Sequence, residues 1–453
     1  MADTPQPKGL TRIVAASLVG TTIEWYDYFL YGSAAALVFG KVFFPESDPL
    51  TGTLLAFLTY AIGFAARPLG ALVFGHFGDR IGRKQLLVVS LLMMGVSSAL
   101  IGCVPGYTTI GIAAPILLTT LRVVQGFALG GEWGGAVLLV SEHGDARRRG
   151  FWASWPQGGA PAGNLIAVGV LSLMTSVQSD AAFVSWGWRI PFLCSLLLIA
   201  VGIAMRMRVS ESPVFEALEQ RKNVRRVPAL TVFHKAPLRL VLSLALTAPI
   251  AFNSYMYTTY GLTFSVSKGV SSRDTLIGVI LATFLAIFLV PLTGFLSDRF
   301  GRKPVFLIQV ALTGVIAFPY FALLNTGNPE LLFLGAVVLV APTNFALTGA
   351  QAGYLPELFA SAYRYSGVAM SRELTTAGLT SFTPIVGLGL VSVMHGQPWL
   401  LAGACLFVSL LSFTAVCFLP ETRGIIMTPD AADTSEASTV PASEADDTTP
   451  AVA

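Results

Sequence analysis

The chain has 453 residues, of which 54% are hydrophobic and 12% are charged. Soluble domains carry roughly 25% charged residues, so a soluble fold of this length could not cover its surface with so few charges. The composition therefore excludes an ordinary cytosolic enzyme, a nucleic-acid-binding protein and a disordered protein. Because the apolar residues are spread along the whole chain, it predicts an all-α polytopic membrane protein.

Apolar runs long enough to cross a membrane recur along the sequence. A membrane-spanning helix needs about 20 apolar residues, and several runs are longer and contain Gly or Pro, so tilted or kinked helices are expected. The twelve predicted spans are 13–38, 53–74, 86–104, 110–141, 151–174, 189–207, 237–265, 275–296, 304–325, 331–356, 366–394 and 399–419.

The basic residues predict the orientation of these spans. With the N-terminus inside, 21 Lys and Arg residues fall in inner segments and 4 in outer segments, and basic residues favour the cytoplasmic side. Both termini are therefore predicted to be cytoplasmic. The predicted order is an N-terminal segment 1–12, a six-helix half 13–207, a basic linker 208–236, a second half 237–420 and a disordered tail 421–453, which is polar and cannot bury a core.

Residues that hold metals or nucleotides are not grouped in this sequence. The cysteines and histidines are scattered, without metal-ligand spacing, and there is no Gly-rich loop ending in Gly-Lys-Ser/Thr. We therefore expect no metal, no cofactor, no enzymatic activity and no ATP-driven pumping, and we interpret the cysteines as small hydrophobic residues. The residues concerned are Cys103, Cys194, Cys405, Cys417, His76, His143, His234 and His395.

One ten-residue pattern occurs twice. Residues 75–84 and 294–303 both read G-x-x-x-D-R-x-G-R-K, follow the second and eighth spans, and are 219 residues apart. Recurrence at one half-length, in matching positions, predicts two pseudo-symmetric six-helix halves.

This pattern resembles the signature loop of the major facilitator superfamily. The resemblance implies twelve helices in two halves, substrate bound between them near mid-membrane, and transport by alternating access. It also implies that the two loops clamp helices at the inner face. The expected gating residues are Gly75, Asp79, Arg80, Arg83, Asp298, Arg299 and Arg302.

Further motifs resemble one branch, the metabolite:proton symporters of bacterial inner membranes. They include Glu24-Trp25-Tyr26-Asp27, Arg67-Pro68-Leu69-Gly70 and Gly130-Gly131-Glu132-Trp133. Phe43-Phe44-Pro45 and Tyr363-Arg364-Tyr365-Ser366-Gly367 look most like the shikimate transporter group. That group usually has an aromatic residue and an amide where this chain has Arg372 and Glu373, which argues against shikimate itself.

Ionisable residues inside predicted spans are functional candidates, because burying one at mid-membrane costs about 2.5–3.5 kcal/mol. Glu24 and Asp27 share a helix face, and they and Arg122 lie near mid-depth. Gln125 and Glu132 extend the polar stripe of Arg122. We predict proton coupling by Asp27, Glu24 and Glu132. Substrate contacts are predicted for Arg122, Gln125, Tyr31, Arg372, Tyr257 and Asn344.

Several of these assignments have structural alternatives. Arg67 and Arg372 are near enough to span ends to reach the surface. Arg372 and Glu373 are adjacent, so they cannot both point squarely into one cavity. Tyr257 and Asn344 have neighbours at helical spacing and could instead form interhelical hydrogen bonds.

The predicted mechanism begins with Arg122 paired to Asp27 or Glu24. An incoming carboxylate then displaces the acid, which takes up a proton, so that anion and proton bind cooperatively. The predicted function is proton-coupled uptake of a small organic acid, such as shikimate or a related cyclic or aromatic carboxylate, by a monomer whose partners are the anion, protons and lipid. The alternatives are a symporter of a betaine- or proline-type zwitterion and one of di- or tricarboxylates.

Overall fold

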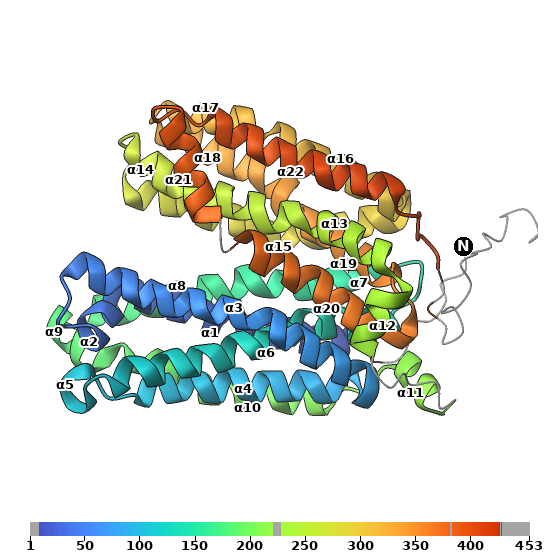
Figure 1. The fold of residues 1–453 in the computed structure, drawn as a ribbon, viewed down its shortest axis with the longest axis horizontal. Helices are drawn as coiled ribbons and strands as arrows, with labels where there is room; N and C mark the ends of the chain where they lie inside the picture. The colour runs from blue at the N-terminus through green and yellow to red at the C-terminus, as the bar shows by residue number, and fades with distance from the viewer. Residues whose placement is uncertain (1–8, 221–227, 381–382, 426, 428–453) are drawn as a thin grey trace, which may run out of the picture.

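The computed structural model describes residues 9–220, 228–380, 383–425 and 427. Most of the predicted N-terminal segment, and the predicted disordered tail from 428 onward, lie outside these residues. Helices of the two halves form two neighbouring groups, drawn in blue to green and in yellow to red (Figure 1). The described part of the chain contains helices and turns and no strands.

The N-terminal half contains six spans, some of them built from consecutive helical segments. These are α1 (Leu10–Ala34) with η1 (Ala35–Phe39) and α2 (Gly40–Phe43), α3 (Pro49–Ile81), α4 (Arg83–Cys103), α6 (Ala113–His143), α7 (Arg149–Ser154) with η2 (Trp155–Gly158) and α8 (Gly159–Val177), and α10 (Arg189–Met207). Short α5 (Tyr107–Ile110), α9 (Asp180–Ala182) and η3 (Phe183–Gly187) join spans at one end.

The C-terminal half repeats this arrangement. Its spans are α13 (Pro237–Tyr255) with η4 (Met256–Tyr260) and α14 (Gly261–Ser267), α15 (Ser272–Phe300), α16 (Arg302–Val315) with α17 (Ala317–Asn325), α18 (Pro329–Leu334) with η5 (Gly335–Phe345) and α19 (Ala346–Glu357), α20 (Arg364–Thr375) with η7 (Thr376–Thr380) and α21 (Thr383–Val393), and α22 (Trp399–Phe418). A short η6 (Ser361–Tyr363) precedes α20, and the linker contains α11 (Pro213–Gln220) and α12 (Pro228–Lys235).

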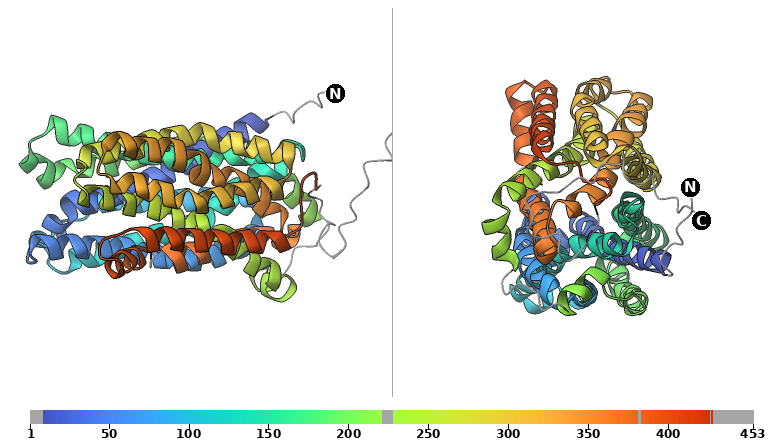
Figure 2. Two further views of the ribbon diagram at one scale, coloured as in Figure 1. Left: turned by 90° about the horizontal axis from the view of Figure 1, so that it is seen from above. Right: turned by 90° about the vertical axis from the view of Figure 1, so that its right-hand side faces the viewer.

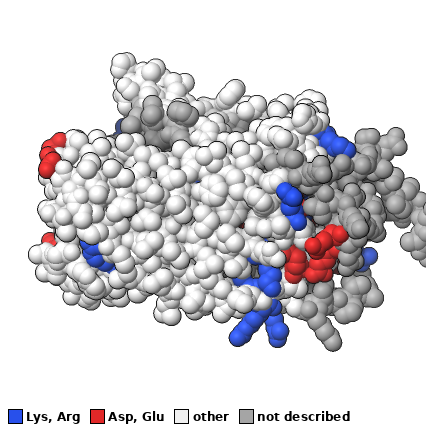
Figure 3. All heavy atoms as spheres, turned by 60° about the horizontal axis from the view of Figure 1, so that its bottom comes forward, with Lys and Arg blue, Asp and Glu red and all other residues white. Residues whose placement is uncertain are grey.

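The outer surface is apolar, as a lipid-facing surface must be. Ten of the described helices are long and apolar enough to cross a membrane. The other two expected spans are the one that begins with α1 and the one formed by α20, η7 and α21. Large apolar side chains such as Leu197 and Phe418 are 70% and 75% exposed. On the face shown in Figure 3, most of the charged residues gather toward one end and leave a wide uncharged band.

The buried arginines Arg83, Arg149, Arg302 and Arg364 begin helices at one end of the bundle, which is called the basic end here. The sequence predicts that this end is cytoplasmic. The two halves meet there. α3 packs against α20, and α15 packs against α7, so each half contributes one helix to each contact. In Figure 1 the two groups of helices come together on the side of α12 and α20 and diverge toward α5 and α14; Figure 2 gives two further views.

Glycines set the spacing of the helices that carry the central charges. Gly126 of α6 lies directly against the backbone of Gly63 in α3, and a Cβ at either position would overlap the other helix or the Arg122 side chain. Gly159 and Gly163 place α8 in the same way against α1. The Gly159-x-x-x-Gly163 pair thus serves helix packing, as small residues commonly do in membranes.

Candidate functional site

The two acids of α1 are completely buried and have separate partners. Glu24 and Asp27 are both 0% exposed. Ser195 of α10 donates a hydrogen bond to Asp27 Oδ1. Glu24 Oε1 is 3.3 Å from Nη1 of Arg206, which is also on α10. The sequence therefore placed both acids correctly in the protein interior, where they face α10.

Arg206 lies between two acids. Its Nη2 is 3.5 Å from Glu132 Oε1, and its Nη1 also donates to the Leu87 carbonyl of α4. Glu132 Oε1 accepts a second hydrogen bond from Thr21 Oγ1, at 2.7 Å. The sequence places Arg206 at the inner end of the span 189–207 and counts it among the inner basic residues. The structure has it in the last turn of α10, where it is 3% exposed because it contacts Glu24 of α1 and Glu132 of α6.

Arg122 is surrounded by tyrosine rings. Its guanidinium carbon is 4.7 Å from the ring centroid of Tyr28, 4.3 Å from that of Tyr31 and 4.5 Å from that of Tyr60. Its Nη1 donates to Gln125 Oε1 at 2.9 Å. Its Nε and Nη2 have no hydrogen-bond partner among the described residues. Nε and Nη2 form the planar fork of donors that matches a carboxylate.

The predicted pairing of Arg122 with Asp27 or Glu24 is wrong for this state. Among the described residues neither acid forms a salt bridge with Arg122, although Asp27 is close enough for an electrostatic interaction with it. Arg206 takes Glu24, and cation–π contacts offset part of the cost of burying Arg122. Similar depth along two helices does not decide which neighbour a side chain faces.

A buried ion pair joins the two halves. Arg67 of α3 donates to both carboxylate oxygens of Glu373 in α20, at 2.7 and 3.1 Å, and the two side chains are 3% and 1% exposed. Arg67 therefore does not reach the surface. Arg372 is 16% exposed, and its guanidinium carbon lies 4.1 Å from the Trp133 ring centroid. Its Nη1 has no partner among the described residues.

The candidates in the C-terminal half mainly connect helices. Tyr257 donates to the Thr313 carbonyl of α16 at 2.5 Å and is 1% exposed, so the structure does not support its predicted substrate contact. Asn344 Nδ2 donates to Ser254 Oγ at 2.8 Å, while its Oδ1 has no partner among the described residues. Asn344 is 0% exposed and forms an interhelical hydrogen bond, so the structure does not support its predicted substrate contact.

The first signature loop holds the C-terminal half at the basic end. Asp79 accepts hydrogen bonds from the backbone N–H groups of Tyr365 and Ser366, at 3.1 and 2.9 Å, where α20 begins. A carboxylate is favourable at a helix N-terminus. Arg83 pairs with Glu142 at 3.3 Å, and Arg364 of the other half pairs with the same acid at 3.1 Å. Gly75 packs closely against Ser366.

The second loop repeats these contacts in the opposite direction. Asp298 accepts from the N–H groups of Gly150 and Phe151, both at 2.8 Å, where α7 begins. Arg302 pairs with Glu357 at 3.1 Å, and Arg149 of the N-terminal half pairs with Glu357 at 2.7 Å. Each half thus caps a helix of the other, and the basic end is closed.

Two predicted gating residues take no part in these contacts. Arg80 and Arg299 are exposed. The Arg80 guanidinium is 3.5 Å from His76, and that of Arg299 lies 5.4 Å from the Phe300 ring centroid. Each of these contacts lies within the residue's own helix, so the predicted gating role of both arginines lacks structural support.

Two glutamates, distant in the sequence, cap the N-termini of α4 and α16, the helices that follow the signature loops. Glu211 accepts from the N–H groups of Arg83 and Lys84, at 3.0 and 3.1 Å. Glu421 accepts from those of Arg302 and Lys303, at 2.9 and 3.0 Å. The prediction that the chain is disordered from residue 421 is therefore wrong for its first residues. Glu421 caps α16, and Thr422 donates a hydrogen bond to Glu357.

Loss of either glutamate should destabilise the helix that it caps at the basic end. We expect Glu211→Gln and Glu421→Gln each to lower the free energy of unfolding by about 1–2 kcal/mol, the usual value of a lost helix cap and its interaction with the helix dipole. Thermal unfolding of the purified protein measures this. Glu219→Gln, at an exposed position in the last turn of α11, is the control and should not lower stability. Equal stability of all three variants would contradict the capping role.

The acids Glu142 and Glu357 and their arginine partners were not among the predicted site residues. A signal was present, because Glu142 precedes Arg149 by seven residues and Glu357 precedes Arg364 by the same interval. A search for a second repeat near the half-length offset would have found it. Arg206 has no such signal, since a basic residue at the inner end of a span is common.

The comparisons with known proteins agree with this architecture. A family model described as "Sugar (and other) transporter" matches residues 13–229. The chain is 41% identical over 384 residues to the inner membrane metabolite transport protein YhjE of Escherichia coli (strain K12), covering 83% of this chain and 86% of that protein. It is 36% identical to the shikimate transporter of the same organism, covering 85% and 89%.

The chain belongs to the major facilitator superfamily. It is also 36% identical to the proline/betaine transporter of Escherichia coli (strain K12), over 82% of this chain and 76% of that one. Its relatives are membrane transporters rather than enzymes. A double tryptophan mutant of XylE superposes with a TM-score of 0.77 at 17% identity, covering 93% of this chain and 98% of the other.

The same fold is found in XylE, described as a proton:xylose symporter, bound to 6-bromo-6-deoxy-D-glucose. The TM-score is 0.73 at 16% identity, with 92% of this chain and 97% of that chain covered. These structures share the fold of two six-helix halves. The predicted fold class, the predicted superfamily and the absence of an enzyme family are thereby confirmed.

Proposed function

We propose that this transporter couples the uptake of a small organic anion to protons by alternating access. The observation that carries the proposal is the buried guanidinium of Arg122, whose Nε and Nη2 have no acceptor among the described residues. It lies within electrostatic range of the buried acid Asp27. A cation with open donors beside a titratable acid can bind an anion and a proton together.

The coupling follows from charge balance. A positive Arg122 favours the ionised form of Asp27. When a substrate carboxylate neutralises Arg122, the ionised acid loses that support, and burial then favours its protonated form. Anion binding therefore promotes proton binding, and thermodynamic linkage requires the converse. In this scheme the substrate binds an arginine that is already unpaired rather than displacing an acid from it.

The cross-half contacts supply the gate. Asp79 and Asp298 hold the first turns of α20 and α7 while the basic end is closed. Opening that end must break these contacts and the Arg67–Glu373 pair together. A loaded site with balanced charge would allow this rearrangement, because fewer unpaired charges would cross the apolar interior.

The test is uptake into proteoliposomes under an imposed pH gradient. The panel contains shikimate, quinate, benzoate, a dicarboxylate and glycine betaine. We expect pH-driven accumulation of a carboxylate, and we expect Asp27→Asn to abolish accumulation while retaining exchange at equal pH. Asp274→Asn, a change at the exposed N-terminal turn of α15, is the matched control. Undiminished pH-driven accumulation by Asp27→Asn would refute the scheme.

The similarity to the proline/betaine transporter favours a zwitterion as the second candidate. A zwitterion also carries a carboxylate for Arg122, and its ammonium group would need an acid or an aromatic face. Accumulation of glycine betaine alone from the panel would select this candidate.

A further inference from the structure

Buried polar atoms without partners follow one face of α1. Positions 17, 20, 24 and 27 are separated by three and four residues, so they share that face. Asp27 Oδ2, Glu24 Oε2 and Ser17 Oγ have no hydrogen-bond partner among the described residues, and the three residues are at most 3% exposed. At about 1.5 Å of rise per residue they extend over about 15 Å toward the basic end.

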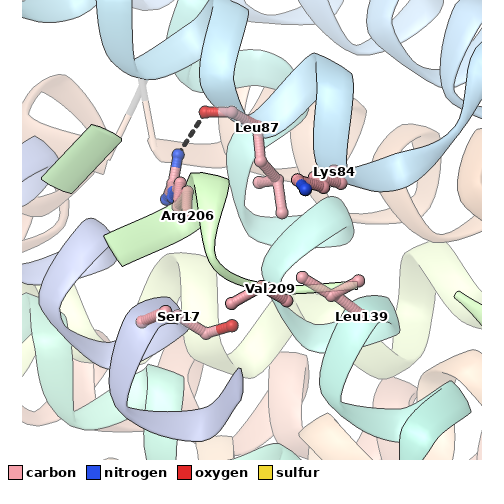
Figure 4. Close-up of a pocket in the computed structure, with 7 residues that line it drawn as sticks. Ser17, Lys84, Leu87, Leu139, Arg206 and Val209 are labelled. Atoms are coloured by element: carbon pink, nitrogen blue, oxygen red, sulfur yellow. Dashed lines mark hydrogen bonds between the residues drawn. The ribbon is translucent and has the colours of Figure 1, made fainter. Parts of the chain in front are cut away.

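A small cavity lies at the Ser17 end of this face (Figure 4). Its volume is about 10 Å³, close to the smallest that holds one water molecule. Ser17 Oγ and Arg206 Nε, from two residues that line the cavity, lack partners among the described residues and could bind that water. The lining residues are Ala16, Ser17, Lys84, Leu87, Leu139, Arg206 and Val209.

Arg206 connects this cavity to the acids. It lines the cavity and pairs with both Glu24 and Glu132, and a side chain at Gly20 would overlap its guanidinium. Gly20 thus leaves the space that the arginine needs. The segments of α8 and η2, which also pack on α1, contain no charged residue. Among the described residues, charged groups around this face are Arg206 of α10, Arg122 and Glu132 of α6, Lys84 of α4 and Arg67 of α3.

We propose that this face of α1 is the route by which the coupling proton passes between Asp27 and the basic end. The proton leaves the Asp27 carboxyl group, crosses to Glu24, passes to water in the cavity lined by Ser17 and Arg206, and reaches the aqueous phase beside Lys84. Each donor regains its starting state, so only a proton moves. The inference rests on the proton symport proposed above and separates the proton route from the path of the substrate between the halves.

The C-terminal half provides a matched control. Ser243 is the seventh residue of α13, a position close to that of Ser17, which is the eighth residue of α1. The buried Oγ of Ser243 also lacks a partner among the described residues. The α13 segment contains no acid. Replacing either serine by valine exchanges one buried hydroxyl for a methyl group and adds a second methyl group, so the two variants make the same chemical change. The two variants thus differ in whether a titratable group lies on the same helix face.

The first test follows proton access to Asp27 directly. Infrared spectroscopy of the purified protein at acidic pH would record hydrogen–deuterium exchange of the carboxyl band that Asp27→Asn removes. We expect Ser17→Val to slow this exchange at least about tenfold, the effect of losing about one hydrogen bond in the chain, and Ser243→Val to leave it unchanged. Ser17→Ala is the second variant in case valine does not fit. Exchange as fast in both Ser17 variants as in the unaltered protein would overturn the proposed proton route.

The second test uses whichever of shikimate, quinate, benzoate and glycine betaine the unaltered protein accumulates. Ser17→Val should retain exchange at equal pH but lose most pH-driven accumulation, whereas Ser243→Val should retain both. If the unaltered protein accumulates none of them under a pH gradient, the proposed symport fails, and the infrared measurement still decides the route. Full pH-driven accumulation by Ser17→Val would argue that protons take another path.

Discussion

Arg122→Gln should lower uptake of the transported carboxylate about 30-fold or more. Truncating one partner of a buried, hydrogen-bonded charge pair costs about 2–5 kcal/mol. Arg122 acts electrostatically on Asp27, and two of its donors lack partners among the described residues. The variant should still fold, because it removes a charge that no carboxylate balances among the described residues. Uptake kinetics in proteoliposomes, together with thermal unfolding, separate these two effects.

Arg122→Lys should be intermediate. Lysine keeps the charge but loses the planar fork and the stacking against Tyr28, Tyr31 and Tyr60. Arg189→Lys is the matched control, because Arg189 also stacks on an aromatic ring, that of Trp188, at 4.5 Å, but donates to backbone carbonyls near the end of α4. Its uptake should stay near that of the unaltered protein. If Arg122→Gln retains its affinity for the anion, the binding site lies elsewhere.

Neutralising Glu373 should strongly destabilise the closed basic end. Glu373→Gln leaves Arg67 buried without its counter-ion, and breaking a buried ion pair in this way costs about 3–5 kcal/mol. Arg67→Gln should have a similar effect for the same reason. The double variant removes both charges. Its loss in free energy of unfolding should therefore be smaller than the sum of the losses of the two single variants. Thermal unfolding of the four proteins gives the coupling energy, expected to exceed about 1.5 kcal/mol.

A second cycle shows whether this coupling is specific. Arg372 also approaches Glu373, but at 3.9 Å, from the same helix and with a more exposed side chain. The Arg372–Glu373 cycle should therefore give a much smaller coupling energy. Comparable values in both cycles, or additive effects of Arg67→Gln and Glu373→Gln, would mean that the cross-half pair is not a distinct contact.

The long apolar runs and the repeated loop were sufficient to predict the fold. Hydrophobicity decides which segments lie in lipid, and it is a property of a segment rather than of its neighbours. Two copies of a loop with a helix-capping aspartate predict equivalent roles in two halves, and Asp79 and Asp298 do cap α20 and α7. Helical spacing likewise predicted that Glu24 and Asp27 share one face of the first span.

The contacts of a side chain with residues on neighbouring helices could not be predicted from the sequence in the same way. Spacing gives the direction of a side chain relative to its own helix, whereas its contacts depend on the rotation and separation of the neighbouring helices. Arg206 was counted only as a basic residue at the inner end of a span, yet the space beside Gly20 lets it reach Glu24 and Glu132. The same reason explains why Arg67 meets Glu373 instead of the membrane surface.

The sequence by itself determined that this is a two-half membrane transporter with acids and arginines inside its spans. Only the tertiary structure decided which of those charges neutralise one another and that Arg122 keeps open donors. The physical reason is that an ion pair requires two groups within about 4 Å in the correct orientation. Close glycine contacts set the separation between helices and therefore that geometry.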